Sequence, residues 1–192
     1  MGDYNEFNKL RIHCHDNAFY NFASAWIFEK RASKLRKRLM GLTFLGIVVP
    51  ITIGSVVVSF GIKFPFFNVL ITVGSILLII QLICSILSLV AKWDDEFAYS
   101  SESVSSDYSL FKRFKELGDN PPQDISEFKI KVELLSLENK IRTDSDYKHN
   151  ISEKEKRIGH RAALRQFQKE CIACKKIPTS MKSSDCDICG NF

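Results

Sequence analysis

Four of the six cysteines in the chain form two CxxC pairs close together in sequence. The pairs are Cys171-Ile-Ala-Cys174 and Cys186-Asp-Ile-Cys189, and eleven residues separate them. Two such pairs can present four thiolates to one ion, and a tetrahedral site with four sulfur ligands is typical of zinc. Gly190 follows the last cysteine and permits the tight backbone turn of a zinc knuckle. We therefore predict a small zinc-binding tail over residues 171–192.

Other uses of these cysteines are disulfide or redox chemistry and an iron–sulfur cluster. A redox dithiol needs one CxxC at the N-terminus of a helix in an α/β domain, and two pairs so close together argue against it. A closed set of four cysteines leaves no open coordination position, so the predicted zinc is structural and not catalytic.

Catalytic motifs find little support elsewhere in the chain. It has no cluster of serine, histidine and acid, no glycine-rich phosphate loop and no HExxH motif. The adjacent acids Asp94 and Asp95 point apart on a helix, as do His13, Cys14 and His15. We expect the protein not to be an enzyme, the two histidines to be surface residues, and Cys14 to pack as a small apolar side chain.

Two long uncharged apolar runs dominate the middle of the chain, at residues 39–62 and 69–91. At about 1.5 Å of rise per residue, each run is long enough to cross the ~30 Å hydrocarbon layer of a bilayer as a helix. A buried hairpin in a soluble protein is the alternative, but paired uncharged runs of this length are rare there. We predict a transmembrane hairpin over 39–93, with a bend at 63–68.

Basic residues collect immediately before the first run. Because cationic side chains resist translocation, this collar predicts that both termini of a multi-pass membrane protein are cytoplasmic. The net charge of +5 is explained more simply by membrane retention than by nucleic-acid binding, so a nucleic-acid partner is not expected. The collar consists of Lys30, Arg31, Lys34, Arg36, Lys37 and Arg38.

The remaining segments predict an all-α protein with cytoplasmic helices on both sides of the hairpin, over residues 1–38 and 94–170. In the first segment an apolar face recurs at steps of three and four residues and needs a partner, by default the C-terminal helices. Asp124 and Ser152 have the pattern of helix N-caps. The basic residues after Ser152 are expected to form a solvated face, and contact with phosphate or nucleic acid is the alternative. The N-terminal face comprises Phe7, Leu10, Cys14, Ala18, Phe22 and Ala25, and the helix after Asp124 carries the stripe Ile130, Leu134, Leu137 and Ile141.

Weakly polar stripes run along both predicted spans. Lipid offers nothing to these groups, so they should face protein or water. Helix–helix packing is the simpler interpretation, and pore lining is the alternative. Two helices cannot enclose an aqueous path, so a pore would require a homo-oligomer. The stripes are Thr52, Ser55 and Ser59 in the first span and Gln81, Ser85 and Ser88 in the second.

The order of a helix, a basic collar, two spans with a short bend, and cytoplasmic helices resembles the SLATT superfamily of two-transmembrane effectors. The two CxxC pairs and their spacing resemble the mobilome CxxCx(11)CxxC proteins. The resemblance implies a role in prokaryotic anti-phage defence or a mobile-element system, with segments in the prokaryotic inner membrane that assemble into pores and kill or arrest the cell. Because the chain has no sensor domain of its own that we recognise, the trigger would come from a separate sensor partner. A membrane-anchored zinc adaptor without pore activity is the alternative, and a membrane thiol-redox protein is a weaker one.

Overall fold

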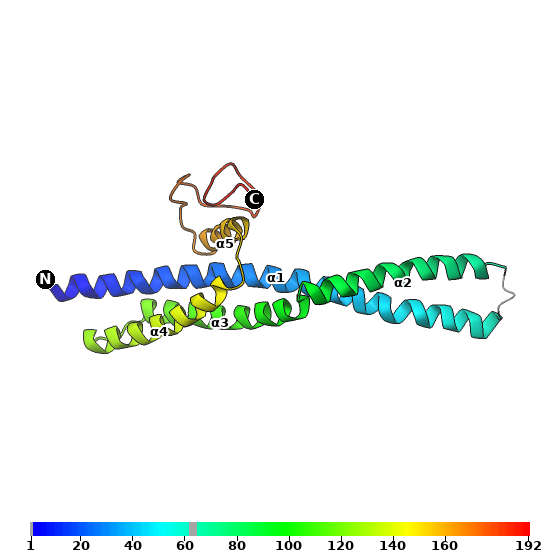
Figure 1. Ribbon diagram of the computed structural model, residues 1–192. Helices are drawn as coiled ribbons and strands as arrows, with labels where there is room; N and C mark the ends of the chain where they lie inside the picture. Colours follow the sequence, from blue (N-terminus) through cyan, green and yellow to red (C-terminus); the bar gives the residue numbers. More distant parts are fainter. Residues whose placement is uncertain (1, 62–64) are drawn as a thin grey trace. The chain divides into compact units, whose positions relative to one another are not determined.

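A computed structural model describes residues 2–61 and 65–192, and the described chain is entirely helical apart from loops and turns. The prediction of an all-α architecture is confirmed. Ile62, Lys63 and Phe64, which end the first predicted span and begin the predicted bend, lie outside the described residues. The helices are α1 (Gly2–Phe60), α2 (Phe67–Val90), α3 (Trp93–Asp119), α4 (Ile125–Tyr147) and α5 (Glu153–Gln166) (Figure 1).

These helices build two compact units. We call Met1–Lys30 together with Ser100–Phe192 the core unit, and Arg31–Tyr99 the hairpin unit. Helix α1 is continuous for 59 residues and contributes to both units. This confirms that the N-terminal helix runs directly into the first apolar run, as the absence of glycine and proline between Asp3 and Met40 predicts.

One hydrophobic cluster of the core unit joins α1 to α3 and α4. Cys14 and Ala18 of α1 are fully buried there against Phe114 of α3 and Phe128 of α4. The predicted N-terminal face is therefore correct, and the C-terminal helices are its partner. Burial raises the pKa of the Cys14 thiol to about 11, so this cysteine behaves as a small apolar side chain.

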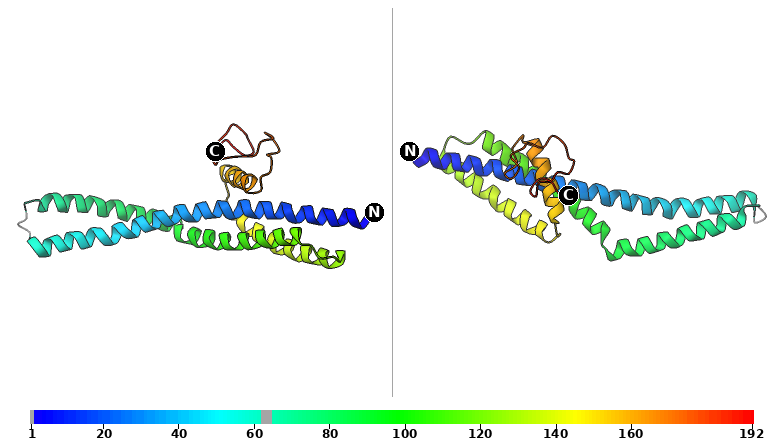
Figure 2. Two further views of the ribbon diagram at one scale, coloured as in Figure 1. Left: turned by 180° about the vertical axis from the view of Figure 1, so that it is seen from behind. Right: turned by 90° about the horizontal axis from the view of Figure 1, so that it is seen from above.

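A second cluster joins α1 to α5 and the tail. Phe19 and Phe22 of α1 pack against Ala163 of α5, and Phe22 also makes edge-on ring contacts with Phe111 (5.4 Å) and Phe167 (6.0 Å between centroids). Within the core unit, the ribbons of α5 and of α3 and α4 lie on different sides of α1 (Figures 1 and 2), and Phe167 at the C-cap of α5 reaches Phe111 of α3 at 5.9 Å between ring centroids. The N-terminal part of α1 is thus covered from two sides by later segments.

Helix α4 begins where its sequence predicts but buries a different face. The Asp124 carboxylate accepts hydrogen bonds from the backbone N–H groups of Ser126 (3.3 Å) and Glu127 (3.2 Å), which makes it an N-cap. The face that packs into the core carries Phe128, Val132 and Leu135. The predicted apolar stripe is exposed instead, with Ile130, Leu134, Leu137 and Ile141 all at least 58% exposed.

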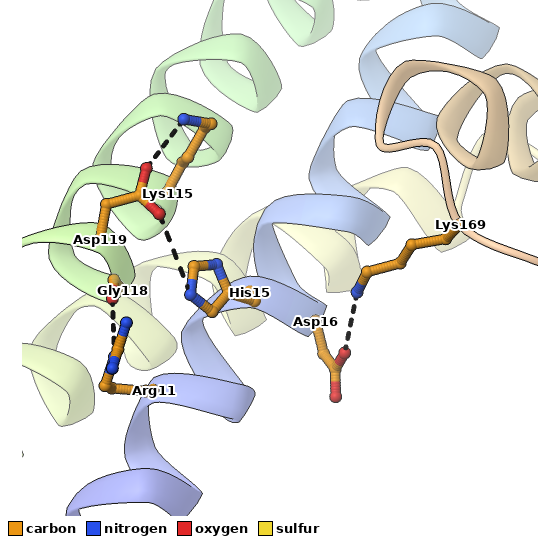
Figure 3. A network of polar contacts seen from close by, with 7 residues as sticks. All are labelled: Arg11, His15, Asp16, Lys115, Gly118, Asp119 and Lys169. Atoms are coloured by element: carbon orange, nitrogen blue, oxygen red, sulfur yellow. Dashed lines mark hydrogen bonds and ion pairs between the residues drawn. The ribbon is translucent and has the colours of Figure 1, made fainter.

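Polar contacts attach the C-terminal end of α3 to α1 (Figure 3). Arg11 Nε donates to the carbonyl oxygen of Gly118 (3.1 Å), and His15 Nε2 lies 3.9 Å from Asp119 Oδ1. Lys115 Nζ donates to Asp119 Oδ2 at 2.8 Å, and this hydrogen bond holds the pKa of Asp119 below its ordinary range. His15 is half-buried and takes part in the contact between helices, so its expected role as a plain surface residue is only partly right.

A buried charge cluster lies between α3 and α4. Arg142 Nε is 3.3 Å from Asp107 Oδ1, and its Nη2 donates to Asp146 Oδ1 at 2.7 Å. Burial, followed by repulsion from Asp146, raises the pKa of Asp107 to about 7, although the Arg142 guanidinium opposes the shift. Two carboxylates therefore share one guanidinium in a site with little access to water.

The hairpin unit pairs α2 with the C-terminal part of α1 (Figure 2). Small residues allow the helices to approach, because a Cβ on Gly46 would meet the Gln81 side chain and one on Gly74 would meet Ile53. Helix α2 starts at Phe67, so Phe67 and Asn68 of the predicted bend are helical. Both helices are long and apolar enough to cross a membrane, and their most apolar stretches are almost entirely unburied.

Candidate metal centre

The four cysteines of the tail converge on one point. Their Sγ atoms all lie within 4.8 Å of one another, and none forms a disulfide. The Sγ atoms of Cys171 and Cys186 are 3.8 Å apart, and those of Cys174 and Cys189 are 3.7 Å apart. Four sulfurs at about 2.3 Å from a tetrahedral zinc would be about 3.8 Å from each other, so the donor set fits such an ion.

Each CxxC pair forms a turn that directs both sulfurs to the same side. The backbone N–H of Lys175 donates to the carbonyl oxygen of Cys171 at 2.8 Å, and Gly190 N–H donates to Cys186 at the same distance. Lys175 and Asn191 adopt positive φ angles of 54° and 55° as the chain leaves the two turns. The two pairs are thus similar knuckles that meet at the cysteine cluster, although the positive φ comes one residue later in the second.

Gly190 is needed for a different reason from the predicted one. Its φ is not in the left-handed region, and the residue that takes the positive φ is Asn191. A Cβ at Gly190 would collide with the backbone and side chain of Ser184. The glycine therefore permits close approach of two chain segments and not a special backbone conformation.

A buried arginine on α5 holds the tail in place. Arg161 is only 8% exposed, and its guanidinium donates to the carbonyl oxygens of Ser180 (2.8 Å) and Cys189 (2.8 Å) and to Ser184 Oγ (3.1 Å). The prediction that the basic residues of this helix form a solvated face is wrong for Arg161. No spacing rule distinguishes Arg161 from its neighbours, because its partners are loop carbonyls fixed only by the fold.

The electrostatic setting differs among the cysteines. Hydrogen bonds from the backbone N–H groups of Cys189 and Ile188 lower the pKa of Cys186 to about 6, which favours the thiolate form of this sulfur. Cys171 and Cys189 are almost fully buried, and burial raises the pKa of Cys189. A thiolate at Cys186 and the buried environment of the cluster favour the binding of a soft metal cation. The charge of the cation would then promote loss of the protons of the remaining thiols.

The predicted polar stripes of the hairpin unit do not face each other. On α2, Ser88 is buried and Gln81 and Ser85 are half-buried, on the side where Gln81 contacts α1 at Gly46. On α1, Thr52, Ser55 and Ser59 are exposed, and the Thr52 hydroxyl donates to the carbonyl oxygen of Val48 at 2.7 Å. The α2 stripe therefore packs inside the hairpin, whereas the α1 stripe is on its outer surface.

The residues of the basic collar follow one another along α1. Lys30, Lys34, Arg36, Lys37 and Arg38 are exposed, and Arg31 is half-buried. Within the hairpin unit, the Arg38 guanidinium lies 5.2 Å from the centre of the Trp93 ring. A cation stacked on tryptophan at the end of an apolar helix pair is a common arrangement at a membrane interface.

A comparison with models of known protein families identifies the family of this chain. The family model described as "Mobilome CxxCx(11)CxxC protein" matches residues 11–192, which is nearly the whole chain. The chain belongs to this family. The match includes both CxxC pairs, so the cysteine cluster is the feature for which the family is named. No curated protein and no solved structure matches the chain.

Proposed function

We propose that this protein is a membrane effector of a prokaryotic mobile-element or anti-phage defence system, with a zinc-stabilised cytoplasmic core unit and a two-span hairpin that oligomerises to permeabilise the inner membrane. The hairpin unit supplies the observation that supports membrane insertion. Its two helices bury only the faces that they turn toward each other, and large apolar side chains such as Val58 (87% exposed) and Leu82 (62%) cover the rest. Surface of this kind is stable in lipid and not in water.

Pore formation is supported by the position of the hydroxyl groups on α1. Because Thr52, Ser55 and Ser59 lie on the outer surface of the hairpin, they are available to a neighbouring hairpin or to water. Gln81, by contrast, lies against Gly46. Pro50 has no N–H group, so the carbonyl of Gly46, four residues earlier in α1, lacks its usual helical hydrogen-bond donor. The outer α1 stripe is therefore the better candidate for a pore lining, and the α2 stripe for packing within the hairpin.

The biological context comes from the family. Membership in a mobilome family and the SLATT-like order of elements support a role in conflict between mobile elements and their host. The trigger would reach the core unit from a separate sensor partner, and both termini would lie in the cytoplasm.

Membrane potential provides the direct test. Expression of the protein in bacteria carrying a potential-sensitive dye should depolarise the cells, and the double variant S55L/S59L should abolish the effect without changing the amount of protein in the membrane. T72L is a matched control, because Thr72 is an exposed hydroxyl residue on the other helix. Because a high density of hairpins in the membrane should drive their assembly without the trigger, an unchanged potential with abundant wild-type protein in the membrane would reject the pore.

The rejected-pore outcome would favour a membrane-anchored zinc adaptor. The observation behind this second function is the closed four-sulfur site packed on the core unit, where Cys171 and Cys189 join the same cluster as Phe19 and Phe22. Such a site stabilises a surface for a partner without any need for ion conduction.

Metal analysis separates a structural zinc from redox chemistry. The purified protein should contain one zinc per chain, C174S should lose it, and C84S should retain it because Cys84 lies in the hairpin unit. Removal of zinc should cost on the order of 5 kcal/mol or more of tail stability, which limited proteolysis would detect as cleavage after Gln166. A metal-free protein with two disulfides would contradict the zinc assignment.

A further inference from the structure

Helix α4 carries two apolar faces, and the core unit uses only one of them. Phe128, Val132 and Leu135 are buried, while the α4 stripe (Ile130, Leu134, Leu137 and Ile141) is 58–65% exposed. The steps of four, three and four residues match the a and d positions of a heptad, which is the seam along which two helices pair. Four large apolar side chains in a row on one exposed helix face indicate a surface that binds another molecule.

We propose that the α4 stripe binds the α4 stripe of a second copy of this chain, in an antiparallel arrangement about a two-fold axis. A two-fold axis between Leu134 and Leu137 places Leu134 of each copy beside Leu137 of the other and Ile130 beside Ile141. All four apolar residues are then covered by equivalents from the other copy. The contact is self-complementary, so it closes as a dimer.

The charges beside the stripe select this orientation. The positions that flank the seam are Lys131 and Glu138 on one side and Glu133 and Lys140 on the other, and all four are exposed. In an antiparallel pair, each flank meets the same flank of the second copy, so Glu133 faces Lys140 and Lys131 faces Glu138. Two-fold symmetry doubles both contacts, which gives four pairs of opposite charge.

A parallel pair would have the opposite electrostatics. In a parallel pair, Glu133 of each copy would lie beside Glu138 of the other, which gives two repulsive contacts. No flanking pair of opposite charge would compensate for them. Two of the flanking residues already have partners within the chain, since Lys131 Nζ is 2.6 Å from Glu127 and Arg113 Nη1 is 2.7 Å from Glu138. The antiparallel contact extends these pairs into alternating networks, whereas the parallel one does not.

The same charges argue against a lipid surface as the occupant. A helix that lies on an anionic membrane carries an excess of Lys and Arg beside its apolar face. The α4 flanks are balanced, and Glu127 and Asp144 occupy the seam positions just beyond the two ends of the stripe. The stripe is also bordered by open grooves of about 640 Å³ between α1 and α4 and about 380 Å³ between α3 and α4, which can receive side chains of a second helix.

The contact is short and correspondingly weak on its own. The stripe extends over eleven helical steps, roughly 17 Å at 1.5 Å per residue, and the acidic residues that follow at both ends would repel each other. Copies held at high local concentration would pair through it, whereas dilute copies would separate. The inference goes beyond the proposed function, because two core units can pair in this way whether or not the hairpin conducts ions.

Zero-length cross-linking of carboxylates to amines tests the pairing directly. Full-length protein at high concentration in detergent, mixed from ¹⁴N and ¹⁵N preparations, should yield mixed-isotope cross-links between Glu133 and Lys140 and between Lys131 and Glu138. Within one helix these partners are seven residues, or about 10 Å, apart, and the mixed mass proves that two chains are joined. L134E should reduce both cross-links by roughly tenfold or more, while I12E should not, because Ile12 is equally exposed (60%) on α1.

Charge exchange keeps the test valid even if L134E disturbs folding. E133K alone and K140E alone should each pair roughly tenfold less well than wild type, and an equimolar mixture of the two variants should restore association, now with residue 133 of one variant linked to residue 140 of the other. Stronger association of E133K alone would indicate a parallel pair. That result would overturn the proposal. It would also be overturned if no mixed-isotope links formed, if L134E left the links unchanged, or if L134E changed only the binding to vesicles.

Discussion

The two units of this protein treat apolar side chains of the same helix in opposite ways. In the core unit, Ala18, Phe22 and Phe28 of α1 are almost completely buried by later helices and the tail. In the hairpin unit, Phe44, Ile51 and Phe60 of α1 are more than half exposed, although their sequence is more apolar. The apolar character of a helix face therefore does not identify whether protein or lipid covers it. The chain itself covers one end of α1, and we propose that lipid covers the other.

The largest expected effect concerns the two faces of α4 within the core unit. F128A should lower the free energy of unfolding by about 3–5 kcal/mol, because it leaves a cavity under a fully buried ring. L134A on the same helix should change it by less than about 0.5 kcal/mol in dilute detergent, since its side chain is 64% exposed. Urea unfolding followed by Trp26 fluorescence, in a W93F background, measures both. Equal costs would show that the assignment of faces is wrong.

A second prediction compares one residue from each unit at equal exposure. Leu82 in the hairpin and Ile12 in the core unit are 62% and 60% exposed. Arginine at Ile12 meets water and should be neutral, whereas L82R should impair membrane insertion by about 3 kcal/mol if lipid surrounds α2. Alkaline extraction of membranes from cells expressing each variant gives the measurement. The comparison between the units would fail if both variants behaved like wild type.

The smallest predicted effect is a pH dependence confined to the core unit. Because the pKa of Asp107 rises from 3.8 to about 7 on folding, the folded state binds a proton more tightly than the unfolded state does. The unfavourable contribution of Asp107 is absent below pH 4, grows as pH rises and is complete above pH 7. Relative to D107N, the wild type should therefore lose about 2–3 kcal/mol of stability between pH 5 and pH 8. Parallel stability curves for the two proteins over this range would contradict the assignment.

Features set by local sequence were predictable. The caps at Asp124 and Ser152 are as predicted, because their side chains bond to backbone groups two or three residues away. The cysteine cluster was predictable because two closely spaced CxxC pairs are typical of the four ligands of one metal ion. The buried face of α1 followed only in part, because most of the predicted stripe is buried but Phe19, Ile27 and Phe28 beside it are buried as well.

Features set by tertiary choice were not predictable. Helix α4 has two apolar stripes, and periodicity alone cannot say which of them enters the core. Ser100 and Ser103 lie in a segment that favours helix weakly, yet both are fully buried in α3, because small side chains suit a close packing partner. Arg161 looks like its basic neighbours until the tail folds over it.

The packing of the tail on α1 has a consequence for biosynthesis. Phe19 and Phe22 are synthesised well before Ala163, Cys171 and Cys189, which pack against them and are made about 140–170 residues later. At roughly 5–20 residues per second, these later partners are made about 7–34 s after the two rings. The four-cysteine site can therefore bind a metal only after the hairpin has been synthesised.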